Sequence, residues 1–212
     1  CANGAASRIG PRVYRCRGAN VIPIHNEPDG LNINRACGST DMASLQAAVR
    51  EYGAHAGVAF DGDADRCLAV DEKGAVVDGD HILLLCAEQL QRRGELAGNT
   101  LVATVMSNLG LELAARQRGI TLRRTAVGDR YVLEEMLRGG YSLGGEQSGH
   151  IIFLSHNATG DGLATGLALL SAMKTEKQPL SVLAARMTSM PQVLVNVPLR
   201  PESRGLLAQD EQ

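Results

Sequence analysis

An acidic loop that follows an apolar segment carries the densest chemical signal in the sequence. Asp61, Asp63 and Asp65 stand at alternate positions directly after the apolar residues 57–60. In an extended loop, alternate side chains point the same way, so the three carboxylates would gather on one side. At about 4 Å and an effective dielectric of about 20, each pair repels by about 4 kcal/mol, which a divalent cation would remove. Oxygen ligands favour hard cations, so we expect a Mg²⁺ site.

Other interpretations of this loop have to be weighed against a metal site. A solvated acidic turn would contain the same residues. An EF-hand loop would need glycine where the chain has Arg66, and it would need flanking helices rather than strands, so we exclude it. A phosphatase using Asp61 as nucleophile and Asp63 as general acid would have Thr or Val in place of Asp65. It stays as an alternative.

Arg66 follows the three carboxylates immediately and has two possible roles. Its planar guanidinium could clamp a phosphate group through two parallel hydrogen bonds. It could also form a structural salt bridge to one of the aspartates. The loop alone leaves both roles open.

A glycine-rich loop at 144–150 is the second candidate for binding. Its glycines let the backbone approach a ligand closely. Glu146 offers two acceptors for adjacent sugar hydroxyls, Ser148 can donate or accept, and His150 could carry a proton near neutral pH. Taken alone, a plain turn explains the loop. Beside a metal site suited to phosphate, it becomes a candidate for sugar binding.

The segment Gly128-Asp129-Arg130 lies between a strand pattern and a helix pattern. Backbone N–H groups at the helix start, together with Arg130, could favour an anion or a ligand rich in hydroxyls. A simple helix cap by Asp129 is the alternative. The segments 155–157 and 160–162 contain further polar candidates, but spacing alone cannot define a catalytic triad there.

The elements that carry these loops alternate between strand and helix patterns. The apolar run 19–24 predicts a strand, and 41–52 predicts a helix capped by Ser39 or Thr40 and ended by Gly53. Such alternation indicates an α/β protein: two consecutive α/β domains with mixed, mostly parallel sheets covered by helices.

The two loops fall into different predicted domains. We expect residues 1–77 to carry the acidic loop and residues 78–188 to carry the glycine-rich loop. Residues 189–212 would be a linker toward a further, missing domain. The chain opens on Cys rather than Met, so we expect a segment of a longer protein.

Composition excludes several kinds of partner. Lys and Arg number 21 against 23 Asp and Glu, giving a net charge of −2, and aromatic residues make up only 3%. We therefore expect no nucleic-acid partner. No apolar run is long enough to span a bilayer, so we expect no membrane partner either. An odd number of cysteines without CxxC spacing, and the lack of a signal peptide, favour the reducing cytoplasm.

Three motifs in this order resemble the α-D-phosphohexomutases. They are Phe60–Arg66 (FDGDADR), Val127–Val132 (VGDRYV) and Gly145–His150 (GEQSGH). Together with the opening CANGA, they are most similar to the phosphoglucosamine mutase branch, and the resemblance extends to about Pro198. Members have four domains around a cleft, of which this chain resembles the second and third.

The resemblance implies a role for each candidate residue. Asp61, Asp63 and Asp65 would hold Mg²⁺, and Arg66 would lie near the phosphoryl group. His150 would transfer a proton or contact the substrate. The residues that would face the sugar are Gly128, Asp129, Arg130, Glu146 and Ser148.

The implied reaction needs parts that this chain lacks. In the family, a phosphoserine of the first domain phosphorylates glucosamine 6-phosphate, and the 1,6-bisphosphate then returns its other phosphate and leaves glucosamine 1-phosphate. The phosphoserine loop and the C-terminal phosphate-binding domain are missing. Ser155-His156-Asn157 imitates that loop only superficially, because Ala158 replaces its proline. We therefore expect the chain to need those domains and a hexosamine phosphate, and to be inactive alone.

Two alternatives remain besides the phosphatase. A related member acting on mannose or glucose phosphates would share the motifs, because the residues themselves do not distinguish an amine from a hydroxyl. A non-catalytic metal-binding module would share the acidic loop alone.

Overall fold

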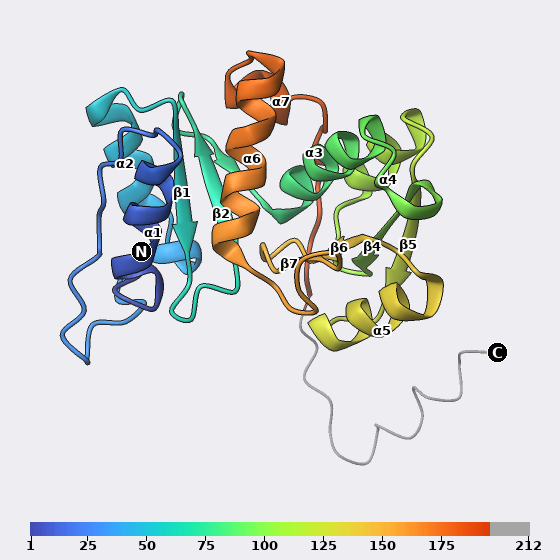
Figure 1. Cartoon of the computed structure of the whole chain (residues 1–212), viewed down its shortest axis with the longest axis horizontal. Helices are drawn as coiled ribbons and strands as arrows, with labels where there is room; N and C mark the ends of the chain where they lie inside the picture. Colours follow the sequence, from blue (N-terminus) through green and yellow to red (C-terminus); the bar gives the residue numbers. More distant parts are fainter. Residues whose placement is uncertain (196–212) are drawn as a thin grey trace.

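The chain folds into two sheets with helices packed on them, in a computed structural model that describes residues 1–195 (Figure 1). The helices are α1 (Ala6–Cys16), α2 (Ala43–Tyr52), α3 (Gly79–Arg92), α4 (Leu109–Gln117), α5 (Asp129–Gly139), α6 (Gly162–Glu176) and α7 (Leu180–Ala184), with 3₁₀ turns at Gly38–Thr40 and Ala97–Asn99. The strands are β1 (Ala56–Phe60), β2 (Cys67–Asp71), β3 (Val76–Val77), β4 (Thr100–Thr104), β5 (Thr121–Thr125), β6 (Leu143–Gly145) and β7 (Ile151–Phe153).

The first sheet has the order β1-β2-β3 and is antiparallel throughout. Phe60 pairs with Cys67, so the acidic loop is the connection of the β1–β2 hairpin. Asp71 shapes the next turn, because its side chain accepts hydrogen bonds from the backbone N–H groups of Lys73 and Ala75. The predicted α/β class is confirmed. The prediction of mostly parallel strands is wrong for this sheet. The short loops between β1, β2 and β3 can join only antiparallel neighbours.

The second sheet has the order β5-β4-β6-β7. Strand β4 runs parallel to β5 and β6, and β7 runs antiparallel to β6. Side chains of β4 alternate between two layers: Leu101 and Ala103 face the core with α3 and α4, whereas Val102 packs with Val132 and Met136 of α5. The sheet is therefore covered on both faces, as the pattern predicted.

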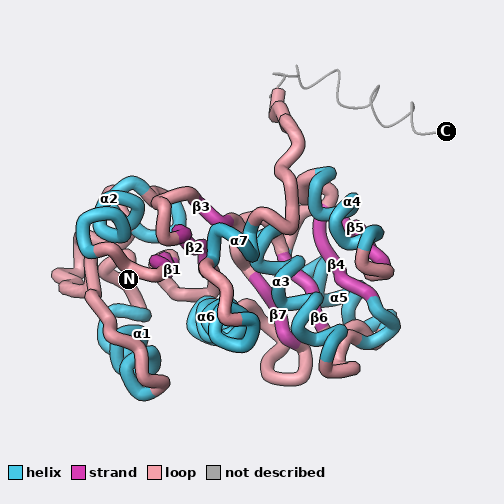
Figure 2. Tube along the Cα trace, turned by 90° about the horizontal axis from the view of Figure 1, so that it is seen from above, coloured by secondary structure: helices cyan, strands magenta, loops and turns pink. Residues whose placement is uncertain are grey.

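Helix α6 connects the two sheets. It lies between them in both views (Figures 1 and 2). Leu163, Leu167 and Leu170 of α6 pack with the first sheet's core around Phe60, whereas Leu169 belongs to the core of the second sheet. The two halves thus share buried apolar surface. The domain boundary near residue 77 remains a prediction from the sequence.

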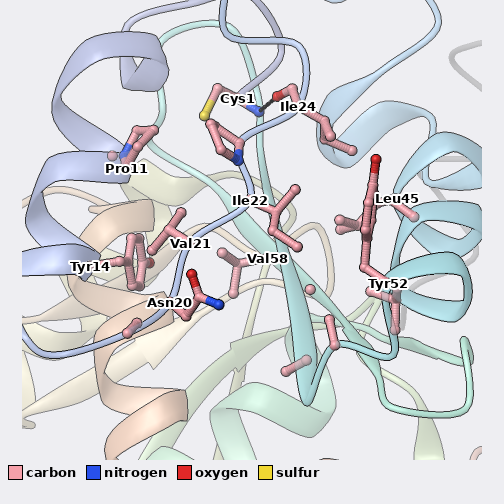
Figure 3. A pocket seen from close by; sticks show the side chains of 18 of the residues that line it. Cys1, Pro11, Tyr14, Asn20, Val21, Ile22, Ile24, Leu45, Tyr52 and Val58 are labelled. Carbon is pink, nitrogen blue, oxygen red and sulfur yellow. Dashed lines mark hydrogen bonds between the residues drawn. The ribbon is translucent and has the colours of Figure 1, made fainter.

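The predicted strand at 19–24 does not form; the segment is extended but has no ladder partner among the described residues. It lies across an apolar cavity of about 160 Å³ from β1, with Val21 and Val58 among the lining residues (Figure 3). Residues of α1 and α2 line the same cavity. The run is apolar because it faces this cavity, but apolarity alone does not bring two strand edges within hydrogen-bonding distance.

Helix α1 forms although Gly10 and Pro11 both disfavour a helix interior. Burial overrides this preference: Gly10, Pro11 and Tyr14 are buried. The predicted helix end at Gly53 is confirmed, with φ +57, but neither Ser39 nor Thr40 caps α2. The backbone N–H of Ala43 instead donates to Asp41.

The predicted linker divides into two parts. Residues 189–195 have no regular structure, but Asn108 donates hydrogen bonds to Met190 and Gln192, which ties this part to the start of α4. The remainder, 196–212, lies outside the described residues. Within the described chain, no helix combines the length and apolarity that crossing a membrane requires.

A buried ion network joins the helices of the second half. Glu88 of α3 is only 5% exposed and accepts from Arg118 after α4 and from Arg186 after α7. Arg186 also pairs with Glu176 at the end of α6. Four helices therefore depend on two carboxylates.

Replacing Glu88 tests this network. We expect Glu88→Ala to lower the free energy of unfolding by about 3–5 kcal/mol, because the guanidinium group of Arg118 would lose its carboxylate partner and that of Arg186 would keep only Glu176. Urea denaturation measures the effect. The control Arg116→Ala breaks an exposed pair with Glu112 and should change stability by less than about 0.5 kcal/mol. Equal losses of unfolding free energy in Glu88→Ala and Arg116→Ala would contradict the argument that the buried ion pairs of Glu88 stabilise the fold more than an exposed pair does.

Candidate active site

The acidic loop brings three carboxylates together. Asp61, Asp63 and Asp65 each offer an oxygen, and these three oxygens lie within 4.8 Å of one another. Ala64 has a φ of +66, a left-handed conformation that bends the loop between its last two aspartates. The structure thus brings these residues together as the sequence predicted.

The first residues of the chain support this loop, which sequence reasoning missed. The backbone N–H of Ala5 donates to Gly62 O at 2.8 Å. A Cβ at Gly4 would lie 2.1 Å from Gly62 O, and one at Gly62 would lie 2.8 Å from the Asn34 side-chain nitrogen. Gly4 is therefore required by a backbone contact, whereas a Cβ at Gly62 would have to displace the Asn34 side chain. The only signal available was the pair of glycines, Gly4 and Gly62.

Burial and charge repulsion both change the pKa values of the cluster. Burial, a hydrogen bond with Asp65 and the charges of Asp65 and Asp63 raise the pKa of Asp61 from 3.8 to about 6. Burial opposes ionisation of Asp65 too, but hydrogen bonds from Asp61 and His150 and the charge of Arg66 hold its pKa below the usual value. Below a pH of about 6 the cluster therefore holds a proton, which a cation would displace.

Arg66 is turned toward the carboxylates. Its Nε lies 3.8 Å from Asp61 Oδ2 and 3.9 Å from Asp65 Oδ1, and its backbone N–H donates to Asp61 Oδ1 at 3.2 Å. The guanidinium thus offsets cluster charge without a hydrogen bond at Nε, and its side chain is 42% exposed. Both sequence interpretations, ion pair and anion contact, fit this placement.

The glycine-rich loop lies directly beside the acidic loop. Arg66 and His150 form an isolated antiparallel bridge, and the backbone N–H of Cys67 donates to Gly149 O at 3.0 Å. Gly149 has a φ of +93, and a Cβ there would lie 2.4 Å from Cys67 O. Backbone contact between the halves therefore joins the two loops.

His150 is enclosed at this junction, with 3% exposure. Its Nδ1 lies 2.9 Å from Asp65 Oδ2, and its Nε2 accepts from the Gly160 backbone N–H at 2.9 Å. Asp129 Oδ2 is 4.0 Å from Nε2. Both ring nitrogens therefore face protein atoms.

Glu146 connects the glycine-rich loop to the start of α5. Its two oxygens accept from the backbone N–H of Gly128 at 3.1 Å and from the Ser148 hydroxyl at 3.4 Å. Both side chains are half-buried. The proposed sugar-facing residues of two separate loops thus form one polar group.

The residue at the cap of α5 is not Asp129, which the sequence offered as a simple helix cap. Gly128, with a φ of +131, occupies the cap position, and Asp129 is the first helical residue. A simple cap by Asp129 is therefore wrong. Arg130 is 80% exposed and pairs with Glu134.

The other polar candidates do not join the site as side chains. Ser155 and His156 form an exposed pair on the turn after β7. Asp161 caps α6 by accepting from Ala164 N at 2.9 Å. Gly160 takes part through its backbone, as described for His150.

The donors at the acidic loop fit a hard cation. Asp65 Oδ1 is buried and has no hydrogen-bond partner among the described residues, although a buried carboxylate oxygen is normally satisfied. Asp65 also contributes one of the oxygens that lie within 4.8 Å of one another. Three carboxylate donors without sulfur or nitrogen suit Mg²⁺ or Ca²⁺ better than softer metals.

The fold and the site define a class: an α/β protein with a carboxylate cluster on a β-hairpin, joined by backbone to a polar, glycine-rich loop. The family described as phosphoglucomutase/phosphomannomutase, alpha/beta/alpha domain II matches residues 1–74, and its domain III matches residues 78–190. The chain belongs to the phosphoglucomutase/phosphomannomutase family.

Curated relatives refine this assignment. The chain is 60% identical over 197 residues to a phosphoglucosamine mutase of Symbiobacterium thermophilum, covering 93% of this chain and 44% of the relative. It is 60% identical over 199 residues to a phosphoglucosamine mutase of Corynebacterium diphtheriae, covering 94% of this chain and 44% of the relative. The chain thus spans less than half the length of the curated relatives it matches.

Solved structures share the fold. A phosphoglucomutase/phosphomannomutase family protein of Burkholderia thailandensis matches with a TM-score of 0.78 and 25% identity, over 92% of this chain and 42% of that one. An N-acetylphosphoglucosamine mutase of Aspergillus fumigatus, in complex with GlcNAc-6P and magnesium, matches with a TM-score of 0.71 and 20% identity, over 94% of this chain and 50% of that one.

The raised pKa of Asp61 predicts a conflict between stability and metal binding. Because its pKa is about 6 in the fold against 3.8 ordinarily, the folded state binds more protons between these pH values, and stability falls as pH rises through them. Metal-free Asp61→Asn should therefore be more stable than wild type at pH 7, by about 1 kcal/mol after allowance for solvent screening.

Thermal denaturation in EDTA at pH 4 and pH 7 measures this difference. The control Asp63→Asn alters an exposed member of the cluster and should gain less stability. A metal-free Asp61→Asn protein no more stable than wild type at pH 7 would contradict the repulsion argument.

Gly149→Ala tests the junction of the loops, with Gly30→Ala as a matched control. The two glycines have φ of +93 and +91, but a Cβ at Gly30 meets nothing within 4 Å. Both changes should cost about 1–3 kcal/mol in backbone strain. Gly149→Ala should lower the free energy of unfolding by more than Gly30→Ala, because the added Cβ at position 149 must also displace the Cys67 carbonyl. Urea denaturation that finds equal losses would refute the close-contact explanation.

Proposed function

We propose that this chain forms the metal-binding and sugar-binding part of a phosphoglucosamine mutase. The whole enzyme would interconvert glucosamine 6-phosphate and glucosamine 1-phosphate through a 1,6-bisphosphate. One observation carries the proposal: backbone contact joins a three-carboxylate loop to a polar glycine-rich loop. The identity of 60% to two proteins named phosphoglucosamine mutase supports the choice of sugar.

The acidic loop would hold the metal ion. Asp61, Asp63 and Asp65 would bind Mg²⁺, which, when bound, stabilises negative charge on the phosphoryl group being transferred. Arg66 would direct its exposed guanidinium end to the same group, because its Nε already faces the carboxylates. Its role would be to hold the phosphoryl group in place.

The polar group around Glu146 would orient the sugar. Glu146 and Ser148 are half-buried and lie within hydrogen-bonding distance of each other, so sugar hydroxyls could join the same network. Gly128, Asp129 and Arg130 at the start of α5 would border the sugar, with Arg130 sufficiently exposed to reach it. Positioning of this kind supplies much of the rate enhancement in phosphoryl transfer.

The chain would work together with further domains of the same polypeptide. Phosphoryl transfer needs the phosphoserine and the C-terminal phosphate-binding segment that the family resemblance implies. We propose residues 1–77 and 78–188 as the two central domains, with residues 189–212 leading toward the last one. A sugar-phosphate substrate and free cysteines, of which Cys67 and Cys86 are buried, suit the cytoplasm.

Geometry weighs against the phosphatase alternative. As nucleophile, Asp61 would have to be ionised and open to a phosphate. Its side chain is only 12% exposed, and one oxygen accepts from the Arg66 backbone. A non-catalytic metal module would account for the acidic loop but not for its contact with the glycine-rich loop.

An assay of the whole polypeptide tests the proposal. Asp63→Asn, in the enzyme that contains the phosphoserine domain, should lower kcat/KM for glucosamine 6-phosphate by about 10²–10³-fold, because a charge-stabilising ligand is lost. Arg116→Ala, on the exposed face of α4, should leave it unchanged. The present chain alone should give no turnover.

Substrate comparison tests the sugar. Glucosamine, glucose and mannose 6-phosphates would be assayed side by side with the whole enzyme. We expect the highest kcat/KM for glucosamine 6-phosphate. Equal kcat/KM values for the three sugar phosphates would contradict the proposed amino-sugar specificity. Full activity of Asp63→Asn in the preceding assay would contradict the proposed metal site.

A further inference from the structure

Residues 188–192, near the end of the described chain, are bound to the start of α4 from several directions. Asn108 donates to Met190 O at 2.8 Å and to the Gln192 side-chain oxygen at 3.1 Å, and its own side-chain oxygen accepts from the Met190 backbone N–H at 2.8 Å. The Gln192 side chain in turn donates to Met106 O at 3.0 Å. We call residues 188–192 the exit segment, and Asn108 is its main contact.

Close packing fixes the exit segment at its other end. Met187, just before it, is 4% exposed and belongs to the core of the second sheet. A Cβ at Gly110 would lie 2.1 Å from Thr188 O, so only glycine in α4 lets the segment pass this close. The apolar residues 193–195 are 68–84% exposed. The fixed path thus extends as far as Gln192, and an exposed apolar run begins directly after it.

Asp80 holds Asn108 from the buried side. Its Oδ2 accepts from the Asn108 backbone N–H at 2.7 Å, and the residue is fully enclosed, with 0% exposure. Its other oxygen, Oδ1, is buried and has no hydrogen-bond partner within residues 1–195. Burial raises the pKa of Asp80 from 3.8 to about 6, so the fold loses stability as pH rises between these values. Stability alone therefore does not account for a carboxylate at this position.

The same turn of α3 also contacts the glycine-rich loop. The Gly79 backbone N–H donates to Gln147 O at 3.0 Å, and the Gln147 side chain donates to Asp78 Oδ2 at 3.3 Å. A Cβ at Gly79 would lie 2.2 Å from Glu146 O. Asp78, Gly79 and Asp80 are consecutive, so one short stretch of backbone contacts the glycine-rich loop on one side and Asn108 on the other.

We propose that Asp80 and Asn108 are positioning residues that fix the exit segment relative to the glycine-rich loop, and with it the domain that follows in the whole polypeptide. The proposal rests on the proposed function, in which that domain binds the phosphate of the substrate while the glycine-rich loop orients the sugar. A ligand held at two places binds tightly only where the distance between them is fixed, because ordering a loose connection costs entropy on binding. The exit segment is the connection that sets this distance.

Two substitutions loosen the exit segment from different sides. Asn108→Ser keeps an oxygen that can cap α4 but loses the bonds to the exit segment. Gly110→Ala retains Asn108 and favours the helix, but its Cβ must displace Thr188. Asp41→Ala is the control, because it removes a hydrogen-bond acceptor at the start of a different helix, α2.

Steady-state kinetics of the whole polypeptide measures the effect on the reaction. We expect Asn108→Ser and Gly110→Ala each to raise KM for glucosamine 6-phosphate about tenfold and to change kcat by less than about threefold, because the loss is one of substrate binding. Asp41→Ala should leave KM unchanged. A purely structural role would alter melting temperatures alone, so wild-type KM values in Asn108→Ser and Gly110→Ala would overturn the proposal.

Hydrogen exchange of the 212-residue chain tests the contact without turnover. The Met190 amide should exchange slowly in wild type and about tenfold faster in Asn108→Ser and Gly110→Ala, because its acceptor is lost or displaced. A Met190 amide that exchanges freely in wild type would overturn the positioning role and leave the proposed function standing. A protected Met190 amide in a whole enzyme that does not turn over glucosamine 6-phosphate would overturn the proposed function and, with it, the role of the exit segment in the reaction.

Discussion

Repulsion among three carboxylates is the constraint on which the site depends. Asp61, Asp63 and Asp65 would not stay within 4.8 Å of one another on a free loop, because each charge disfavours the next. The hairpin holds them through covalent geometry and contact with the opening residues of the chain. Burial and, to a smaller extent, this repulsion raise the pKa of Asp61, and a cation would offset the repulsion.

Holding the cluster requires unusually close backbone contacts. Glycines at 4, 62, 149 and 160 stand where a Cβ would come within 2.8 Å of another segment. They let four chain segments meet around one loop, and the bridge between Arg66 and His150 joins the half that carries the acidic loop to the half that carries the glycine-rich loop. The shared core under α6 holds the two halves together, and the ion network at Glu88 joins the helices of the second half.

The site and the core are stabilised in opposite ways. In the core, Glu88 and Glu176 have guanidinium partners within the chain, so their charges are satisfied on folding. In the site, Asp65 Oδ1 is buried without such a partner among the residues described. A buried group left unsatisfied lowers stability, and proteins keep such groups where a ligand completes them. This contrast supports the acidic loop as the place where something binds.

The sequence alone was sufficient for local features. Spacing of Asp61, Asp63 and Asp65 after an apolar strand predicted the cluster, and patterning predicted the α/β class and a helix ending at Gly53, because all of these follow from short-range sequence patterns. Tertiary structure decided the rest. It left 19–24 unpaired, made α1 a helix despite Pro11, and placed His150 against Asp65 and Gly160. Those outcomes depend on contacts between residues distant in sequence, which no local pattern contains.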